Sequence, residues 1–204
     1  MASDRQSHKM KKPNLIIIFI SIFFLAKVCF AITLLLEDEA LQRLFPDAGE
    51  ITRETITASE EQISEIKKVL GGDLVYKIRG KVSLATENQR DFVFYYAKKE
   101  NKLEGVALIL DEPGKWGPIK FIIRLSPRGE IEGVLVMKYT ETRGRPIASR
   151  NFLKQFFGKG INDPLQLDKD IQGVSGATVS SYAACFTMKK AMILYKALVL
   201  KEKL

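Results

Sequence analysis

The residues whose types and spacing could do chemistry gather at 173–181, which read GVSGATVSS. Four hydroxyl side chains stand among small residues here, at Ser175, Thr178, Ser180 and Ser181. Backbone N–H groups at a helix start bind anions, and glycine permits close approach, so the stretch predicts a site for a phosphate-bearing ligand. The same residues also suit an ordinary Ser/Thr helix cap, and the pattern alone leaves both interpretations open.

The helix that would carry this motif is predicted from the periodicity of the residues that follow it. Apolar residues recur at i, i+3, i+4 and i+7 between residues 184 and 198, whereas Lys189 and Lys196 fall on the opposite side. One continuous apolar stripe predicts a helix that docks a single face on a core.

The stretch SGATVSS resembles the S(T)GAT motif of the FMN-binding domain family. This family includes the G subunit of Rnf electron-transport complexes and the C subunit of the sodium-pumping NADH:quinone oxidoreductase. In it, the motif Thr carries FMN through a phosphodiester bond, made by a separate flavin transferase that uses FAD as donor. The resemblance implies covalent FMN on Thr178. It also implies a cofactor-binding segment of Ser175, Gly176, Ala177, Ser180 and Ser181, with either of the last two as a lesser alternative for the attached hydroxyl.

Two further stretches carry the same resemblance. Residues 114–136 resemble the family's Gly-rich loop and hairpin, which implies that Trp116 and Gly117 line the flavin site, although a lone loop Trp also packs over core edges. Glu141 and Thr142 match a family stretch that lies close to the isoalloxazine ring.

Arg143 and Arg145 replace a Pro and a Leu of that family stretch. If the two guanidinium groups point inward, they would raise the potential of a neighbouring flavin. If they point outward, they form a solvated turn or a docking patch for an acidic partner. Both interpretations stay open.

The elements that would position these residues predict an α+β fold with a mixed, mainly antiparallel sheet. Ser59 and Gln62 predict a capping box for a helix that Gly71 ends. Residues 126–129 predict the turn of a hairpin, and residues 152–159 a short helix. Strands are expected at 51–58, 73–80, 91–97, 103–110, 119–125 and 131–140.

Residues 15–36 are apolar except for Ser21, Lys27 and Thr33, and about 33 Å of helix would cross a bilayer. Basic residues precede this run and acidic residues follow it, which predicts a cytoplasmic N-terminus and an extracytoplasmic main domain in the inner (cytoplasmic) membrane. A cleaved signal peptide is the competing interpretation. Lys27 would either pair with an acid on a partner helix or snorkel to the interface.

The resulting organisation has four parts. Residues 1–14 form a cytoplasmic basic tail, 15–36 the transmembrane helix, 37–50 a juxtamembrane helix and linker, and 51–200 the FMN-binding domain. The net charge is +8, of which the tail holds +3 and Lys27 one more, so residues 37–204 hold +4. This modest excess, without an Arg-rich helix, argues against nucleic acid as a partner.

The sequence lacks the residues and motifs that other kinds of chemistry need. The only His is His8, before the membrane segment, so no His-based triad or metal site can form in the main domain, and we expect no metal. Cys29 and Cys185 cannot pair across the membrane boundary. No P-loop or GxGxxG motif occurs.

The favoured function is that of a non-catalytic electron carrier in a membrane redox complex that resembles Rnf and is coupled, in some relatives, to ion transport. Its partners would be other membrane subunits, membrane lipid and, during maturation, the flavin transferase. Two alternatives stay open: a membrane-anchored binding or assembly module without flavin, and a stand-alone flavoprotein of another respiratory chain.

Overall fold

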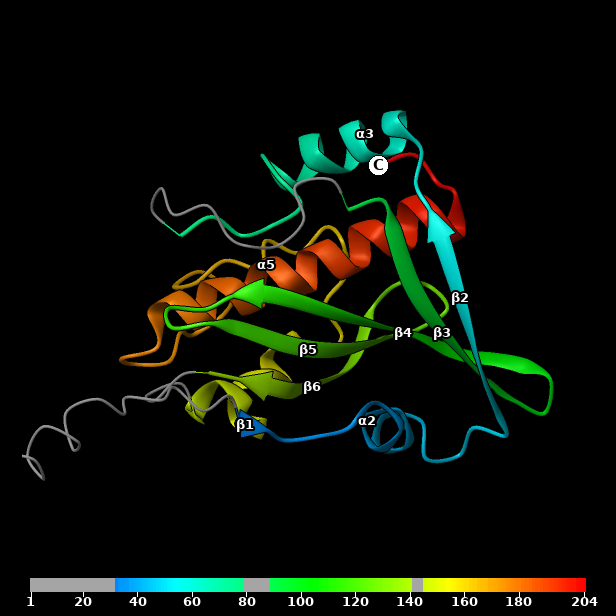
Figure 1. The fold of residues 1–204 in the computed structure, drawn as a ribbon, viewed down its shortest axis with the longest axis horizontal. Coiled ribbons are helices and arrows are strands. Elements are labelled where there is room, and N and C mark those ends of the chain that lie inside the picture. The colour runs from blue at the N-terminus through cyan, green and yellow to red at the C-terminus, as the bar shows by residue number, and fades with distance from the viewer. Residues whose placement is uncertain (1–31, 79–88, 141–144) are drawn as a thin grey trace, which may run out of the picture. The chain divides into compact units, whose positions relative to one another are not determined.

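The computed structural model describes residues 32–78, 89–140 and 145–204, which fold around one antiparallel sheet (Figure 1). The strands lie in the order β1-β6-β5-β4-β3-β2. Their bounds are Ile32–Thr33 (β1), Glu50–Thr57 (β2), Asp91–Lys99 (β3), Lys102–Pro113 (β4), Pro118–Leu125 (β5) and Ile131–Tyr139 (β6). The predicted α+β class is confirmed, and every pairing between these strands is antiparallel.

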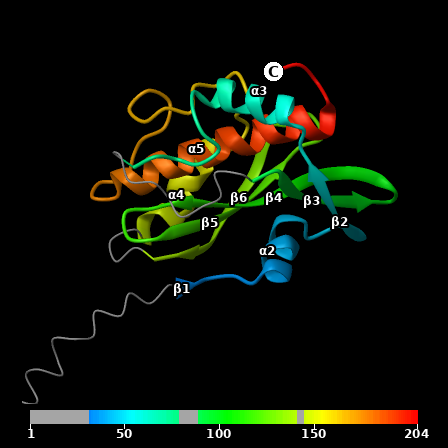
Figure 2. The same cartoon turned by 45° about the horizontal axis from the view of Figure 1, so that its top comes forward.

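Helices cover both faces of this sheet, with α3 and α5 on one face and α2 on the other (Figures 1 and 2). The α-helices are α2 (Glu37–Leu44), α3 (Glu60–Leu70), α4 (Arg150–Leu153) and α5 (Thr178–Leu194). Shorter helical turns are the 3₁₀ turns η1 (Arg145–Ala148) and η2 (Lys154–Phe156) and the π-helical turn η3 (Tyr195–Leu200).

The main core lies between the sheet and α5. Alternate residues of β4, namely Val106, Leu108 and Leu110, are buried in this core together with Met188 and Ala191 of α5. Because α3 packs on α5 as well, α5 is buried on most of its surface. α5 therefore buries more of its surface than the single apolar stripe that the sequence predicts.

A second core lies on the other face, under α2. Leu41 and Leu44 of α2 pack there with Ile122 of β5. The Tyr95 hydroxyl of β3 donates a 2.7 Å hydrogen bond to the Glu37 carboxylate at the start of α2. Burial, together with this carboxylate, raises the pKa of Tyr95 to about 12, so the phenol keeps its proton and the bond at neutral pH.

Local signals in the sequence placed several elements correctly. The capping box is present, since the Ser59 hydroxyl accepts from the Gln62 N–H and the Gln62 side chain accepts from the Ser59 N–H. Gly71 ends α3 in the left-handed conformation, with φ of 77°. The hairpin of β5 and β6 turns at residues 126–129, where the Gly129 N–H donates to the Ser126 carbonyl.

Two expectations were wrong. The membrane helix was expected to run to Leu36, but Ile32–Thr33 pair with β6, and the N–H groups of Leu34 and Leu35 donate to the Met137 carbonyl. The backbone of residues 32–35 is therefore extended, and the edge of β6 supplies its hydrogen-bond partners. Residues 15–31 lie outside the described residues. Among the described residues, no helix is both long and apolar enough to cross a membrane.

The second error concerns residues 73–80, which were expected to form a strand. Among the described residues, 73–77 form no strand and Ile78 forms only a single β-bridge, and the two remaining residues are not described. The backbone of this segment is bound instead by the side chains of Glu112 in β4 and Lys190 in α5.

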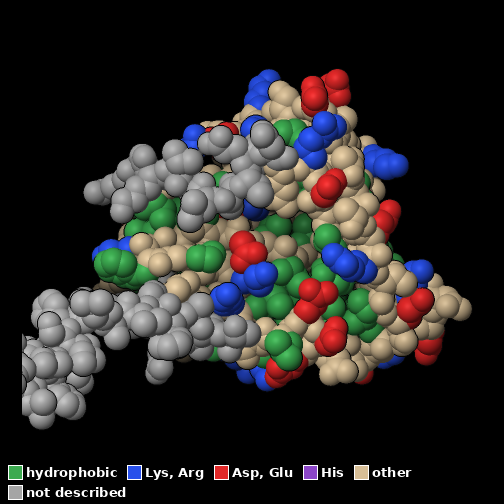
Figure 3. Space-filling view, in the orientation of Figure 1, with side chains coloured by type: hydrophobic (Ala, Val, Ile, Leu, Met, Phe, Trp, Pro, Cys, Tyr) green, Lys and Arg blue, Asp and Glu red, His purple; other side chains and the backbone are tan. Residues whose placement is uncertain are grey.

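Surface charges of both signs are interspersed on the face viewed in Figure 3. Neighbouring strands carry some of these charges as exposed pairs, such as Lys120 of β5 with Asp111 of β4 at 3.2 Å. Exposed pairs of this kind each contribute at most about 1 kcal/mol. The positive net charge therefore does not gather into one patch on this face.

Candidate functional site

The GVSGATVSS motif lies at the start of α5, as expected, with Thr178 as the first helical residue. The turn before the helix needs a glycine, because Gly176 has φ of 76°, a conformation that other residues adopt at a cost. Among the described residues, the backbone N–H groups of Thr178, Val179 and Ser180 have no partner. These N–H groups and the helix dipole create a positive potential at the motif.

The motif hydroxyls divide into an exposed and a buried pair. Thr178 and Ser175 are exposed, whereas Ser180 and Ser181 are fully buried. The Ser181 hydroxyl donates to the Ala177 carbonyl at 3.0 Å and accepts from the Val174 N–H at 3.1 Å, so it braces the turn. Within the described ranges no side chain caps the helix, whose N-cap is Ala177, and this counts against the simple capping interpretation.

The buried Ser180 hydroxyl has no hydrogen-bond partner among the described residues. An orphaned buried hydroxyl is unusual, because it loses its water without recovering the bond. It lies two residues after Thr178, in the first turn of α5. The motif thus has a hydrogen-bonding group that the described part of the chain does not use.

The loop before the motif is held by Asp170 and Gln155. Asp170 accepts hydrogen bonds from the Gln166 N–H at 2.7 Å and the Leu165 N–H at 3.2 Å, and pairs with Lys159 at 3.0 Å. Gln155 donates to the Gln172 carbonyl and accepts from the Gln172 N–H. These bonds fix the path of the chain into residue 173.

Burial alone would favour the neutral form of Asp170. The Gln166 N–H, the Lys159 ammonium and the Leu165 N–H outweigh it and hold the pKa of this carboxyl below its ordinary value. Asp170 is therefore ionised at neutral pH, and its contribution to stability depends on pH.

Replacing Asp170 with Asn is expected to destabilise the protein by about 1–3 kcal/mol at neutral pH, because charge-assisted bonds to the loop are lost. A carboxyl with a lowered folded-state pKa contributes stability above its unfolded pKa of about 4, and this contribution is lost as the pH falls through the folded value. Urea unfolding of both proteins should therefore show a difference that shrinks on acidification. A difference that stays constant with pH would contradict this role.

Trp116 and Gly117 lie in the tight connection between β4 and β5, where the Gly114 N–H donates to the Gly117 carbonyl. The start of α5 lies at the same end of the sheet as this hairpin in both ribbon views (Figures 1 and 2). Trp116 is 59% exposed, and the Lys115 ammonium lies 5.1 Å from its ring centre. Its ring is thus presented at the surface instead of being packed into the core.

A glycine is required at position 117 because the backbone there lies close to Thr140, just after the end of β6. A Cβ at this position would lie 2.6 Å from the Thr140 Oγ1 and 2.8 Å from the Thr140 Cβ. The Thr140 hydroxyl donates to the Pro118 carbonyl at 3.2 Å, which ties the hairpin to β6. Gly117 therefore holds the tip of the hairpin against the strand that leads into residues 141–144.

Gly117→Ala is expected to lower stability by about 1–3 kcal/mol, because the added methyl must displace Thr140 or the hairpin. Adding Thr140→Gly should recover part of the loss by opening space. Gly72→Ala is the matched control, since a Cβ there would meet no atom of the described residues within 4 Å. Thermal melts of the variants measure the effect, and equal melting temperatures for the two Ala variants would contradict it.

Glu141, Thr142 and Arg143 lie outside the described residues, and the side chain of Arg145 is not described either. Their positions beside a flavin therefore stay predictions.

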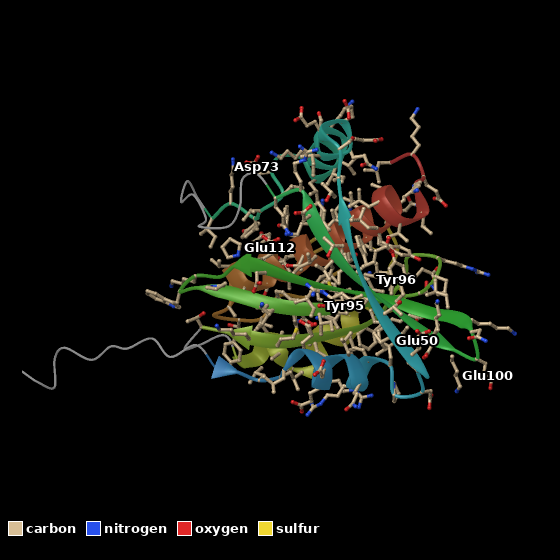
Figure 4. All side chains as sticks on the ribbon, turned by 45° about the vertical axis from the view of Figure 1, so that its right-hand side comes forward. Glu50, Asp73, Tyr95, Tyr96, Glu100 and Glu112 are labelled. Carbon is tan, nitrogen blue, oxygen red and sulfur yellow. The ribbon has the colours of Figure 1, made fainter. Side chains whose placement is uncertain are left out.

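An ion pair that the sequence analysis missed is buried between β4 and α5. Glu112, labelled in Figure 4, is 1% exposed and Lys190 is 3% exposed. The Lys190 ammonium contacts the Glu112 carboxylate directly. Lys190 also donates to the Leu74 carbonyl at 2.9 Å, while Glu112 accepts from the Tyr76 N–H at 2.8 Å. Burial raises the pKa of the Glu112 carboxyl, and the Lys190 ammonium offsets part of that rise.

Aromatic side chains cluster beside this pair. The rings of Tyr76 and Tyr182 stack with 6.4 Å between centres and 15° between planes. Phe186 lies 6.0 Å from Tyr76, and the Lys190 ammonium lies 5.7 Å from the Phe186 ring. Tyr76 lies in the segment that was expected to form a strand, whereas the structure places its ring against α5.

Thiol and metal chemistry find little support in the described residues. The Cys185 thiol is buried, and desolvation raises its pKa to about 12, so it is protonated at neutral pH. Within the described ranges, His, Cys, Asp and Glu side chains form no group able to hold a metal ion.

The arrangement suits an esterified phosphate on Thr178. The exposed Thr178 hydroxyl offers the oxygen, and three backbone N–H groups without partners in the described structure lie at the same helix start. The small residues Gly176 and Ala177 leave room for an approaching group, and the orphaned Ser180 hydroxyl adds a donor in the same turn. The residues present therefore fit a phosphate-bearing group such as FMN.

Comparisons with protein families and with solved structures both gave matches. Residues 114–192 match the family described as FMN-binding domain, a range that runs from the Trp116 hairpin through the motif and most of α5. Among solved structures, the crystal structure of Shewanella oneidensis NqrC is similar, with 17% identity, a TM-score of 0.49, and coverage of 80% of this chain and 85% of that chain. No curated protein matches the chain.

Proposed function

We propose that the chain is an electron-transfer subunit that carries FMN covalently on Thr178, a proposal supported by the match of residues 114–192 to the FMN-binding domain family. The observation that carries the proposal is the exposed Thr178 hydroxyl at the first residue of α5. Ser180 and Ser181 are fully buried, which favours Thr178 over them as the attachment point.

Attachment would be a group transfer from FAD, catalysed by a separate flavin transferase. The Thr178 oxygen forms a bond to the FMN phosphorus, the pyrophosphate bond of FAD breaks, AMP leaves, and the hydroxyl proton is released. The resulting phosphodiester keeps one negative charge at the start of α5. The N–H groups and dipole of this helix stabilise such a charge by about 0.3–1 kcal/mol or more.

The bound FMN would supply the redox chemistry, accepting and donating electrons, while the chain fixes its position and limits its contact with water. Trp116 and Gly117 would lie along the site, and Glu141 and Thr142 remain proposed neighbours. A covalent bond has a clear advantage outside the cytoplasm, because dissociated FMN would be lost there.

A membrane anchor within residues 15–31 remains part of the proposal. These residues are apolar except for Ser21 and Lys27, and about 25 Å of helix meets the lower limit for a span. The basic residues before the run favour a cytoplasmic N-terminus, with the flavin on the extracytoplasmic side. The partners would be membrane subunits of an Rnf-like redox complex, which gentle solubilisation and identification of co-purifying chains would test.

Expression of the full chain with and without the flavin transferase tests the function directly. After denaturation and acid precipitation, the band should fluoresce under ultraviolet light only when the transferase is present. A dark band, from cells in which the transferase modifies a known acceptor protein, would contradict the proposal and favour a flavin-free assembly module.

A further inference from the structure

The geometry beside Thr178 points to a further role: we propose that Tyr182 and Tyr76 form an aromatic platform that stacks on the isoalloxazine ring, positioned by the buried Glu112–Lys190 pair. This inference rests on the proposed function, because it concerns an FMN attached at Thr178. It assigns a binding role to two side chains that lie outside the SGAT motif.

Tyr182 is placed to reach such a ring. It follows Thr178 by four residues, so the two side chains share one face of α5, about 6 Å apart along the axis. The ribityl chain of FMN separates phosphate and ring by more than this rise. Tyr182 is 45% exposed although it lies in a helix that is buried on most of its surface. Tyr182 thus presents accessible side-chain surface to a ligand.

Tyr76 supports Tyr182 from the other side. The two rings are nearly parallel, at 15°, which is the offset-stacked geometry that aromatic pairs favour. Phe186, one turn further along α5, contacts Tyr76 as well. A flavin ring on Tyr182 would therefore extend an existing stack instead of creating a new one.

The ion pair explains why Tyr76 keeps this position without belonging to a strand. The Glu112 carboxylate binds the Tyr76 N–H, and the Lys190 ammonium binds the Leu74 carbonyl. Two rigid elements thereby hold the backbone on both sides of Val75. A buried ion pair seldom makes a protein more stable than an apolar pair would. The role of the Glu112–Lys190 pair here is therefore to position the segment that contains Tyr76.

The test measures fluorescence of the covalent flavin in the native and the denatured protein. A phenol ring stacked on a flavin quenches its fluorescence, so the wild-type signal should rise several-fold on denaturation. Tyr182→Leu should fluoresce several-fold more than wild type in the native state, at equal FMN content per chain. Tyr182→Trp, which keeps a stacking and quenching ring, should resemble wild type.

Phe157→Leu is the matched control for loss of an exposed aromatic. Phe157 is 44% exposed, and its neighbour Gly158 bonds to Ile131, at the end of the sheet opposite the Trp116 hairpin. The quenching of flavin fluorescence should be the same in Phe157→Leu as in the wild type. The positioning role is tested by Lys190→Met with Glu112→Leu, which should keep the melting temperature within a few degrees yet release Tyr76 and raise native fluorescence.

The outcomes separate the platform from the proposed function. Full FMN content with wild-type quenching in Tyr182→Leu would overturn the platform and leave the flavin subunit standing. Wild-type quenching in the charge-free double variant would overturn the positioning role. A wild-type chain without FMN would overturn both, and peptide mass spectrometry distinguishes this case from the others.

Discussion

Thr178→Ala is expected to leave the chain with no covalently bound FMN, even when the flavin transferase is present. The variant lacks the only exposed hydroxyl that lies within the first turn of α5. The fold should persist, because Thr178 is exposed and Ala favours a helix at least as well. Fluorescence of the denatured band, with circular dichroism as a check of folding, gives the result.

Two variants sharpen this prediction. Thr178→Ser keeps a hydroxyl at the same position and should retain covalent FMN. Ser175→Ala removes the other exposed hydroxyl of the motif and should be modified as wild type is. Covalent FMN in Thr178→Ala, or its loss in Ser175→Ala, would mean that the attachment point has been assigned to the wrong residue.

Lys190→Met should destabilise the protein by about 3–5 kcal/mol, because it leaves the Glu112 carboxylate buried without its counter-charge. Burial already raises the pKa of this carboxyl, and loss of the ammonium removes the main influence that opposes the rise. An acid with a raised folded-state pKa loses stability as the pH rises through that value. The defect should therefore be smaller in acid, as urea unfolding at several pH values would show.

Two comparisons isolate the charge. Lys189→Met changes the adjacent, half-buried residue and should alter the free energy of unfolding by no more than about 0.5 kcal/mol. Lys190→Met combined with Glu112→Leu should recover most of the loss, since an apolar pair of similar volume replaces the ion pair. A double variant as unstable as the single one would show that the pair matters through its shape and not through its charge.

Local signals explain what the sequence could predict. The Ser59 and Gln62 capping box and the turn at residues 126–129 depend on neighbours in the chain, and both are confirmed. The predicted boundaries of β2 to β6 lie close to the observed ones for the same reason. The SGAT motif was likewise expected at a helix start, and α5 begins at its Thr178.

Tertiary contacts explain what the sequence could not predict. The residues 73–77 have strand-like composition, yet Glu112 and Lys190 bind their backbone groups and hold them outside the sheet. One signal was available: Glu112 continues the core-facing alternation of Val106, Leu108 and Leu110, which marks a buried carboxylate in need of a partner. Nothing in the periodicity of α5 identified Lys190 as that partner, because α3 buries the outer side of the helix too.

The most direct test of the central claim is the mass of the tryptic peptide that spans residues 170–189, taken from the full chain matured with the flavin transferase. The peptide should gain the mass of FMN less one water, and fragmentation should place the gain on Thr178. An unmodified peptide, or a gain located on Ser175, Ser180 or Ser181, would contradict the claim.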